Sequence, residues 1–429
     1  MRRLGAVLAA VALVLLGSPA RADGHAARTP VKHFVYLMQG DRTFDHYFGT
    51  YPGADGIPDG TCLPADLKKP AAGCAKPYAL HGKAPVSLAA GQSVIDLQYD
   101  QGKMDGFVAA YERQGRDGAA AMGYYDRRDL PFYWNAADRY TLFDHFFASA
   151  RHGTRLNRSY WVAGAPFDPK QPTIFDRLQE AGVSWKFYVQ DYDPHETFRS
   201  LSPTDPATQT VRVPLLNYPR FVDDPKLNGH IADLDEYYRD LERGTLPAVA
   251  YIASSGAGER SARSVPAGQK LVRNLTTQLM LSRYWDSSAL LWSYDGSGGW
   301  YDHVKPPKDH GFRVPALLIS PYVARGKVDG TTLDATSALR FVEENWRLKP
   351  LPGQDGTTVA DLTSAFDFAS GPRPAELIPA TTAVTGGVPP VKAGMVYGVY
   401  GGAAGLAALL VLAAALAHRL PKGARPWRR

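Results

Sequence analysis

Cysteine is nearly absent from this chain of 429 residues, since only Cys62 and Cys74 occur. A zinc site of the usual cysteine and histidine type would need further such ligands close to this pair, and the Gly- and Pro-rich stretch around it, residues 51–77, contains no other cysteine and no histidine. Two cysteines this near in sequence form one disulfide in an oxidising compartment, closing a loop of about 13 residues. We therefore expect a Cys62–Cys74 bridge.

The chain also lacks a concentration of charge outside its two ends. The formal net charge is +6 and the pI is about 9.0, but nine basic residues lie in the first 21 positions or after Val391. The long middle of the chain is therefore close to neutral, which gives no support to nucleic acid as a partner. Internal repeats are absent as well.

The first of two long apolar runs stands at the N-terminus. Arg2 and Arg3 precede apolar residues 4–16, and the small-residue pattern Ala20-Arg21-Ala22 follows. This order is typical of a secretory signal peptide, which we place at residues 1–22. The alternative is an uncleaved anchor, but about 13 apolar residues are too few to cross ~30 Å of hydrocarbon.

The second apolar run stands near the C-terminus. Residues 393–417 carry no charge, and a basic tail follows at 419–429. We expect a Thr-, Gly- and Pro-rich stalk at 371–392, a transmembrane helix at 393–418 and a cytoplasmic tail. A buried core helix is the alternative interpretation. Residues 23–370 would then be the extracytoplasmic domain of a single-pass protein of the cell membrane.

Within residues 23–370, apolar β-rich runs alternate with helix-like stretches. The runs are residues 34–38, 183–189, 248–252, 289–294 and 314–319. Helices are indicated at 173–181 and where Leu271, Leu275, Leu279 and Tyr284 recur at helical spacing. This alternation predicts an α/β fold with a mostly parallel sheet covered on both faces.

In such a fold, ligands bind beyond the carboxyl ends of the strands. Four polar segments would lie at that edge of the sheet: residues 39–46, 153–158, 295–303, and 334–337 leading into a helix. Each contains an aspartate, a hydroxyl or a histidine. We expect the functional site there.

Several segments of the chain resemble motifs of a known family. The matching segments are RTFDHYFG (42–49), GKMDGF (102–107), MGYYD (122–126), DLPFY (129–133), GGWYDHV (298–304), and RVP (313–315) with SP (320–321). They resemble the bacterial phosphoesterase family of phospholipases C and acid phosphatases, in order from about residue 31 to residue 351. The resemblance implies an alkaline-phosphatase-like α/β/α sandwich that hydrolyses phosphate esters with a metal-assisted hydroxyl nucleophile.

By this resemblance, Thr154 stands at the position of the nucleophile, followed by Asn157 and Arg158 as substrate-binding residues. An alcohol is a poor nucleophile at neutral pH, and a bound cation can activate it. Asn157 could donate to a phosphoryl oxygen. Without the resemblance, the sequence would favour a turn before the next element at Gly153 and Thr154.

Asp41 and Asp295 are the candidate ligands of a divalent metal ion. Asp295 follows a buried-looking strand, and a carboxylate there suits a hard cation, although it could also cap the next segment. Four residues are expected to orient the groups of the site without binding the ion themselves: Asp45, His46, Asp302 and His303. For Asp302 and His303, a surface turn is the alternative interpretation.

Several positions depart from the family pattern. Gly40 and Asp41 replace a Glu-Asn pair whose side chains reach the metal, Gly296 replaces a second acid, and Ala335 replaces a histidine. Residues 254–259 stand where a Glu-His-Pro element is expected, and no clear histidine precedes Gly102. A cation at Thr154 would thus need water or other ligands to complete its shell.

His46, His145, His152 and His303 could compensate as ligands, although a lone histidine is more often structural. Two hypotheses follow. The chain is either a membrane-tethered hydrolase of phospholipid headgroups or soluble phosphomonoesters, or a catalytically silent binding or scaffold protein on the same fold. A third, a sulfatase-like esterase, fits the motifs less well.

Overall fold

The computed structural model describes residues 26–83, 86–88, 90–200, 208–256, 258–352 and 359–381. Residues 1–22, residues 382–392 of the predicted stalk and the whole of residues 393–429 lie outside these ranges. Among the described residues, no helix has the length and apolar character needed to span a bilayer. The signal peptide and the C-terminal membrane helix therefore stay predictions.

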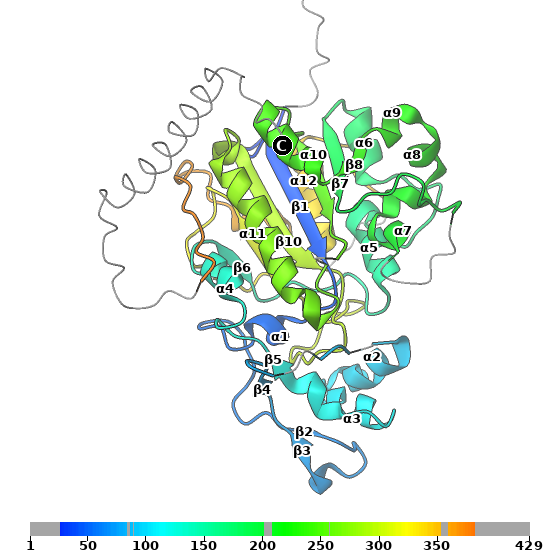
Figure 1. Cartoon of the computed structure of the whole chain (residues 1–429), viewed down its shortest axis with the longest axis vertical. Helices are drawn as coiled ribbons and strands as arrows, with labels where there is room; N and C mark the ends of the chain where they lie inside the picture. The colour runs from blue at the N-terminus through cyan, green and yellow to red at the C-terminus, as the bar shows by residue number, and fades with distance from the viewer. Residues whose placement is uncertain are drawn as a thin grey trace, which may run out of the picture. The chain divides into compact units, whose positions relative to one another are not determined.

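An eight-stranded sheet forms the centre of the fold (Figure 1). Its strands, in spatial order, are β12 (Val328–Asp329), β6 (Thr141–Phe143), β11 (Ala316–Ile319), β10 (Ser288–Tyr294), β1 (His33–Gln39), β9 (Val249–Ala253), β7 (Trp185–Val189) and β8 (Ile231–Asp233). Every neighbouring pair is parallel except the two pairs made by β11, which is antiparallel to both β10 and β6. The predicted α/β fold with a mostly parallel sheet is confirmed.

Helices cover both faces of this sheet, and aromatic pairs show which helix lies on which face. Tyr36 of β1 packs edge-on against Trp161 at a centroid distance of 5.6 Å, whereas Trp292 of β10 packs on the other face against Tyr133 at 4.1 Å. One face carries α5 (Thr154–Ala163), α6 (Ile174–Glu180) and α12 (Ala335–Asn345), and the other carries α4 (Pro131–Ala137), α10 (Asp235–Arg243) and α11 (Val265–Leu281).

The two helices predicted from periodicity are confirmed. Thr173 caps α6 through a capping box with Asp176. Helix α11 buries Leu271, Leu275 and Leu279 along one side, although it ends before Tyr284. The predicted helix after Asp334 is α12, whose first turn Asp334 caps.

Short elements complete the large part of the fold. They are α7 (Gln209–Arg212), η4 (Pro214–Asn217), α8 (Pro219–Asp223), α9 (Pro225–Asn228), η5 (Ala262–Ser264), η6 (Trp285–Ser287) and η7 (Leu362–Ala365).

A smaller part lies beyond the carboxyl ends of β1 and β10, at the bottom of Figure 1. It contains α1 (Phe44–Phe48), β2 (Leu63–Pro64), η1 (Pro70–Ala72), β3 (Cys74–Ala75), β4 (Tyr78–Ala79), α2 (Gln92–Tyr99), η2 (Asp100–Gly102), α3 (Phe107–Glu112), η3 (Gly118–Met122) and β5 (Gly123–Tyr124). A second apolar core, which includes Phe107 and Tyr301, joins several of these elements, whereas the aromatic residues of α1 belong to the main core. The predicted Cys62–Cys74 disulfide is present and links β3 to the chain next to β2.

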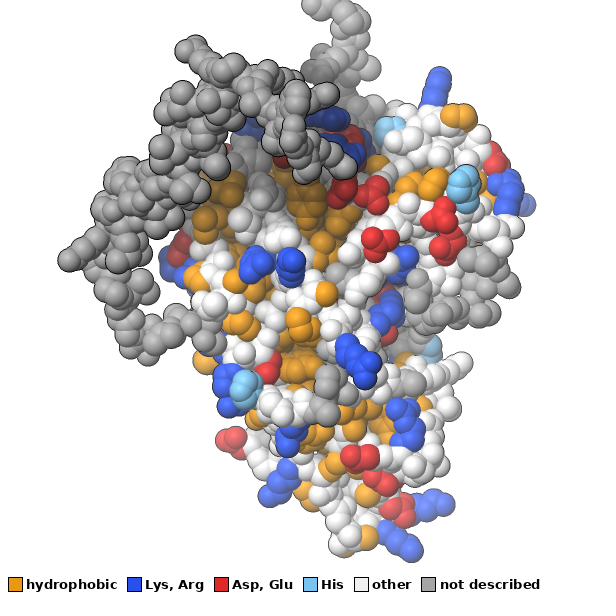
Figure 2. Space-filling model, viewed as in Figure 1, with side chains coloured by type: hydrophobic (Ala, Val, Ile, Leu, Met, Phe, Trp, Pro, Cys, Tyr) orange, Lys and Arg blue, Asp and Glu red, His pale blue; other side chains and the backbone are white. Residues whose placement is uncertain are grey.

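Charged side chains are mixed on the face shown in Figure 2, where basic and acidic groups stand side by side instead of forming one patch of a single sign. This distribution agrees with the near-neutral charge of the middle of the chain.

Candidate active site

The candidate site lies at the carboxyl edge of the sheet, between the large and small parts. Asp41 follows β1 and Asp295 follows β10, and these two strands are parallel neighbours. Both aspartates therefore emerge at the same edge. They line a cavity of about 350 Å³. The remaining lining residues are Leu88, Ala90, Gly91, Ile95, Arg151, Gly153, Thr154, Asn157, Gly296, Ser297 and Gly298.

Thr154, the predicted nucleophile, is the first residue of α5 and lines the same cavity. Gly153 precedes it with φ of 83°, a left-handed conformation that glycine adopts without strain. The unpaired backbone N–H groups and the positive dipole end of a ten-residue helix thus adjoin the hydroxyl. This setting suits an anionic group such as a phosphate ester.

Arg260 joins the three residues that the sequence singled out. Its Nη1 donates to Asp41 Oδ2 at 2.7 Å and to Thr154 Oγ1 at 3.1 Å, and its Nη2 donates to Asp295 Oδ2. The structure therefore brings Asp41, Thr154 and Asp295 together, but around a guanidinium group. Burial alone would lower the pKa of Arg260, yet the charges of Asp295 and Asp41 outweigh it and raise that pKa, so the group stays cationic.

Asp295 is fully buried and serves two arginines at once. Its Oδ2 accepts from Arg260 and also from Arg158 Nε at 2.7 Å. Arg158 further donates to the backbone oxygen of Gln39 at the end of β1. Arg158 thus pairs with Asp295 in the structure, and its predicted role in substrate binding stays a prediction. The second oxygen of Asp295, Oδ1, is buried and has no hydrogen-bond partner among the described residues.

Asn157 lies one turn after Thr154 and holds the loop that precedes α5. Its Oδ1 accepts from the backbone N–H of Ala150 at 2.8 Å, and its Nδ2 donates to the oxygens of Ala150 and Gly153 at 2.9 and 3.3 Å. The amide therefore fixes the position of Thr154. Donation from Asn157 to a phosphoryl oxygen stays a prediction.

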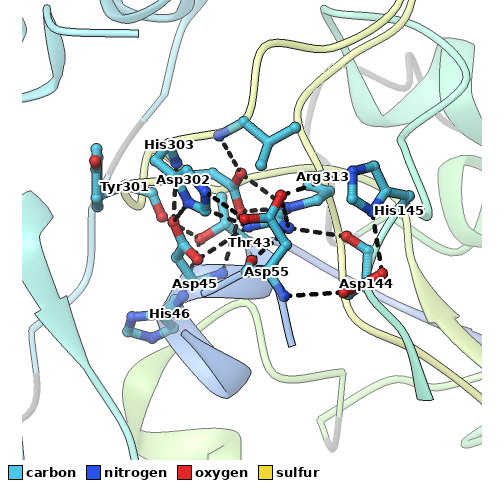
Figure 3. A network of polar contacts seen from close by, with 11 residues as sticks. Thr43, Asp45, His46, Asp55, Asp144, His145, Tyr301, Asp302, His303 and Arg313 are labelled. Atoms are coloured by element: carbon cyan, nitrogen blue, oxygen red, sulfur yellow. Dashed lines mark hydrogen bonds and ion pairs between the residues drawn. The ribbon is translucent and has the colours of Figure 1, made fainter. Parts of the chain in front are cut away.

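Asp45, Asp302 and His303 form a separate cluster around Arg313 (Figure 3). Arg313 donates to Asp45 Oδ1 and to Asp302 Oδ1, both at 3.0 Å, and the whole side chain is buried. His303 Nδ1 lies 2.7 Å from Asp45 Oδ2, and its Nε2 lies 3.1 Å from Asp55 Oδ1. The cluster ties the Gly- and Pro-rich stretch, through Asp55, to the loop after β10.

Burial and the neighbouring charges shift the pKa values of two groups in this cluster, Asp302 and His303. Burial raises the pKa of Asp302 to about 6, against the opposing charge of Arg313. Burial would lower the pKa of His303, but the hydrogen bond that its ring donates to Asp45 and the charges of Asp45 and Asp302 raise it. Ligand atoms of Asp45, Asp302 and His303 lie within 4.8 Å of one another, as a metal site requires.

The other candidate histidines do not reach Thr154. His46 is buried and stacks on Trp300 at 3.7 Å between ring centroids, with Nδ1 2.8 Å from the oxygen of Gly123. His145 contacts Asp144, and His152 contacts Asp96 of α2.

Two cationic residues of the site, Arg260 and Arg151, were not predicted from the sequence. Arg260 lies in a Ser- and Gly-rich loop with no periodic pattern. Arg151 lines the cavity beside Gly153 and lies over the ring of Tyr99 at 3.7 Å. The signal that could have pointed to a cation was the presence of two aspartates at adjacent strand ends without a predicted partner.

The chain is similar to known proteins over most of its length. The model of the Phosphoesterase family matches residues 31–349. Phospholipase C B of Mycobacterium tuberculosis H37Rv is 28% identical over 428 aligned residues, which cover 81% of this chain and 80% of that protein. Phospholipase C A of the same strain is 29% identical, covering 80% and 79%.

More distant similarities extend to a plant and to solved structures. Non-specific phospholipase C1 of Arabidopsis thaliana is 27% identical over 71% of this chain and 63% of that protein. A Vibrio parahaemolyticus protein of the alkaline phosphatase superfamily aligns over 76% of this chain and 70% of its own, with 11% identity and a TM-score of 0.37. The family match and the Asp45–Asp302–His303 cluster together suggest a metal ion of unknown identity.

Proposed function

Because this chain belongs to the phosphoesterase family, we propose that it hydrolyses phosphate esters in the cavity beside Thr154. The observation that carries this proposal is the position of the Thr154 hydroxyl. It stands at the N-terminus of α5, on the wall of the cavity, 3.1 Å from a cationic nitrogen of Arg260. Nucleophile, anion-binding helix end and fixed positive charge are thus combined at one point.

The proposed reaction proceeds in two steps. Thr154 Oγ1 forms a bond to phosphorus while the bond from phosphorus to the ester oxygen breaks, and the hydroxyl proton passes through the cavity to the departing alkoxide. The oxygen of a water molecule then bonds to phosphorus while the bond from phosphorus to Thr154 Oγ1 breaks, one proton of that water restores the hydroxyl of Thr154, and phosphate or a phosphomonoester is released. The helix end and Arg260 oppose the negative charge that builds up in both steps.

The proposed substrate is a phospholipid, with soluble phosphate esters as the alternative. The curated relatives are named phospholipases C. A cavity of about 350 Å³ suits a headgroup phosphate, because it falls within the ordinary range for small-ligand sites. Arg151 on its wall would contact the phosphate oxygens.

The proposal is tested by kinetics with p-nitrophenyl phosphate, bis-p-nitrophenyl phosphate and phosphatidylcholine vesicles. Thr154→Ala should lower kcat by roughly 10³-fold or more, because removal of the nucleophile leaves only binding and electrostatic effects. Thr154→Ser keeps the hydroxyl and should retain measurable turnover. Equal rates for wild type and Thr154→Ala on every substrate would refute the assignment.

A silent binding protein is the second candidate, and one observation favours it. Arg260 already pairs with one carboxylate oxygen of Asp41 and one of Asp295, as it would in a site that only needs to be stable. Such a protein would bind phosphate or lipid headgroups without turnover. The same kinetic series separates the two functions, since a silent protein gives no rate above the Thr154→Ala background.

We further propose that the protein acts outside the cytoplasm, tethered by residues 393–418. The apolar runs at both ends of the sequence and the Cys62–Cys74 bridge support this proposal. Cell fractionation tests it, because the full chain should pellet with membranes and a chain ending at residue 381 should not. Recovery of both chains in the same fraction would contradict the tether.

A further inference from the structure

The guanidinium group of Arg260 stands where the sequence placed a metal ion. Both predicted metal ligands, Asp41 and Asp295, and the predicted nucleophile Thr154 direct an oxygen toward it. Its side chain is 20% exposed, whereas that of Asp295 is fully buried. The cation that faces the nucleophile is therefore part of the protein chain.

Gly40 provides the space for this arginine. A Cβ atom added at Gly40 would lie 2.7 Å from Arg260 Cζ, which is closer than real atoms approach. The backbone N–H of Gly40 also donates to the oxygen of Gly258 at 3.0 Å, so the loop after β1 and the loop that carries Arg260 are joined. A side chain at position 40 would therefore displace the guanidinium of Arg260 from its present place.

Glu259 anchors the Arg260 loop in the core. Its carboxylate is fully buried and accepts from the hydroxyls of Tyr47, at 2.6 Å, and of Tyr133 and Tyr294. The backbone of Glu259 has φ of 64°, the left-handed conformation that non-glycine residues rarely adopt. A strained backbone held by three buried hydrogen bonds places the next residue firmly, and that residue is Arg260.

The charges around Arg260 balance without a divalent ion between the two aspartates. Asp41 and Asp295 carry two negative charges, and Arg260 and Arg158 supply two positive charges in direct contact with them. An added ion would have to displace the guanidinium from both carboxylates. The residues present at Thr154 therefore do not fit a metal ion held by Asp41 and Asp295.

The Asp45–Asp302–His303 cluster is satisfied in a similar way. Each carboxylate oxygen of Asp45 and Asp302 accepts a hydrogen bond from Arg313, from His303 or from a backbone N–H group.

We infer that Arg260 takes the place of a divalent metal ion beside Thr154, so that this protein processes phosphate esters without a metal at its nucleophile. The inference rests on the proposed function for its chemistry, but the placement of Arg260 can be tested without any turnover. A guanidinium supplies a permanent positive charge beside Thr154, which suits the negative charge of a phosphoryl group. The hydroxyl proton and the ester oxygen follow the two-step route given above.

Metal binding is the first test, with the full-length protein in detergent after treatment with EDTA. Isothermal titration with Mn²⁺ should show no stoichiometric site at Asp41 and Asp295 in the wild type. Arg260→Ala frees both carboxylates and should create one Mn²⁺ site, which Arg260→Ala/Asp41→Asn should lose. Arg263→Ala, an exposed arginine three residues further on, is the matched control and should bind as the wild type does.

Turnover is the second test. EDTA treatment should leave the wild-type rate within about twofold, and Arg260→Ala should lower it by about 10²-fold or more. The inference is overturned if the wild type binds Mn²⁺ in a manner abolished by Asp41→Asn, if EDTA removes activity that Mn²⁺ restores, or if Arg260→Ala gains no site. Should Arg260→Ala fail to fold by circular dichroism, Arg260→Gln replaces it in both tests.

The two tests keep the inference apart from the proposed function. If no variant hydrolyses any ester, the proposed function fails, and the Mn²⁺ titrations still decide what occupies the place beside Thr154.

Discussion

At the scale of single residues, the site depends on small side chains that make room for charged ones. Gly268 of α11 faces the carboxylate of Glu259, and a Cβ atom there would lie 1.9 Å from Glu259 Oε1. Gly40 has the same relation to Arg260. The buried glutamate and the arginine that follows it can occupy their positions only because the chain has no side chain at either point.

Gly268→Ala tests this packing directly. The methyl group would push Glu259 away from its three tyrosine donors, and we expect the free energy of unfolding to fall by about 1–3 kcal/mol. Because Arg260 follows Glu259, turnover should fall as well. Denaturant unfolding and the kinetic assay measure the two effects.

Gly256→Ala is the control for Gly268→Ala, since nothing lies within 4 Å of a Cβ atom at Gly256. It should change neither stability nor rate. A fully stable and active Gly268→Ala variant would contradict the role given to Glu259.

Asn157 gives a second prediction at this scale. Its amide makes three hydrogen bonds to the backbone of Ala150 and Gly153, so Asn157→Ala should leave those groups unpaired and cost about 1–3 kcal/mol. Thermal unfolding measures the loss. A variant with unchanged stability but a raised KM would instead assign Asn157 to substrate binding.

At the scale of elements, the sequence predicted the central strands well and the edges poorly. Strands β9 and β11 are continuous apolar runs, and β1 and β10 are nearly so, because strands buried on both faces have no polar side to break the pattern. In β7 the apolar run is broken only by the half-buried Lys186. Strands β6, β8 and β12 contain two or three residues each, too few for any periodicity to appear. The antiparallel direction of β11 depends on tertiary pairing and left no mark in the sequence.

Helix α12 yields a prediction on pH. Glu343 on this helix is 6% exposed, and burial raises its pKa from 4.5 to about 7, although the N–H of Leu351 donates to it. Between these pH values the folded carboxyl keeps its proton while the unfolded one loses it. The free energy of unfolding should therefore fall by about 2–3 kcal/mol as the pH rises from 4.5 to 7.

Glu343→Gln removes this titration while keeping an acceptor for Leu351. The difference in stability between the variant and the wild type should shift in favour of the variant as the pH rises through this window. Denaturant unfolding at pH 4.5, 6 and 8 measures it, and parallel pH profiles for both proteins would contradict the prediction.

At the scale of the whole molecule, the site is formed jointly by the edge of the large sheet and by the small part. Residues from the sheet edge form one wall of the cavity, and Leu88, Ala90, Gly91 and Ile95 from the small part form the other. The Asp45–Asp302–His303 cluster and Arg313 join the two parts (Figure 3). The sequence predicted which segments would meet at this edge, because the end of each apolar run marks the end of a strand.

The sequence could not reveal that the central cation is Arg260. This residue lies 219 positions from Asp41 and 35 from Asp295, in a loop whose path is set by Glu259 and its tyrosines. Two of those tyrosines lie in the motifs RTFDHYFG and DLPFY, so their role appears only once the fold brings them together.

The disulfide offers a prediction at this scale. Opening the Cys62–Cys74 loop with dithiothreitol, or by Cys62→Ser/Cys74→Ser, should destabilise the small part by about 3 kcal/mol at most. The strands of the large sheet should keep their protection. Hydrogen exchange measured by mass spectrometry separates the two parts, and uniform loss of protection would contradict this division.

The proposed reaction depends on covalent transfer of a phosphoryl group to Thr154. Mass spectrometry of the EDTA-treated protein, mixed with bis-p-nitrophenyl phosphate and quenched in acid within the first turnover, measures this step most directly. We predict that the peptide containing Thr154 gains the mass of a p-nitrophenyl phosphoryl group in the wild type and not in Thr154→Ala. Turnover with an unmodified Thr154 peptide, or modification of another residue, would contradict the account.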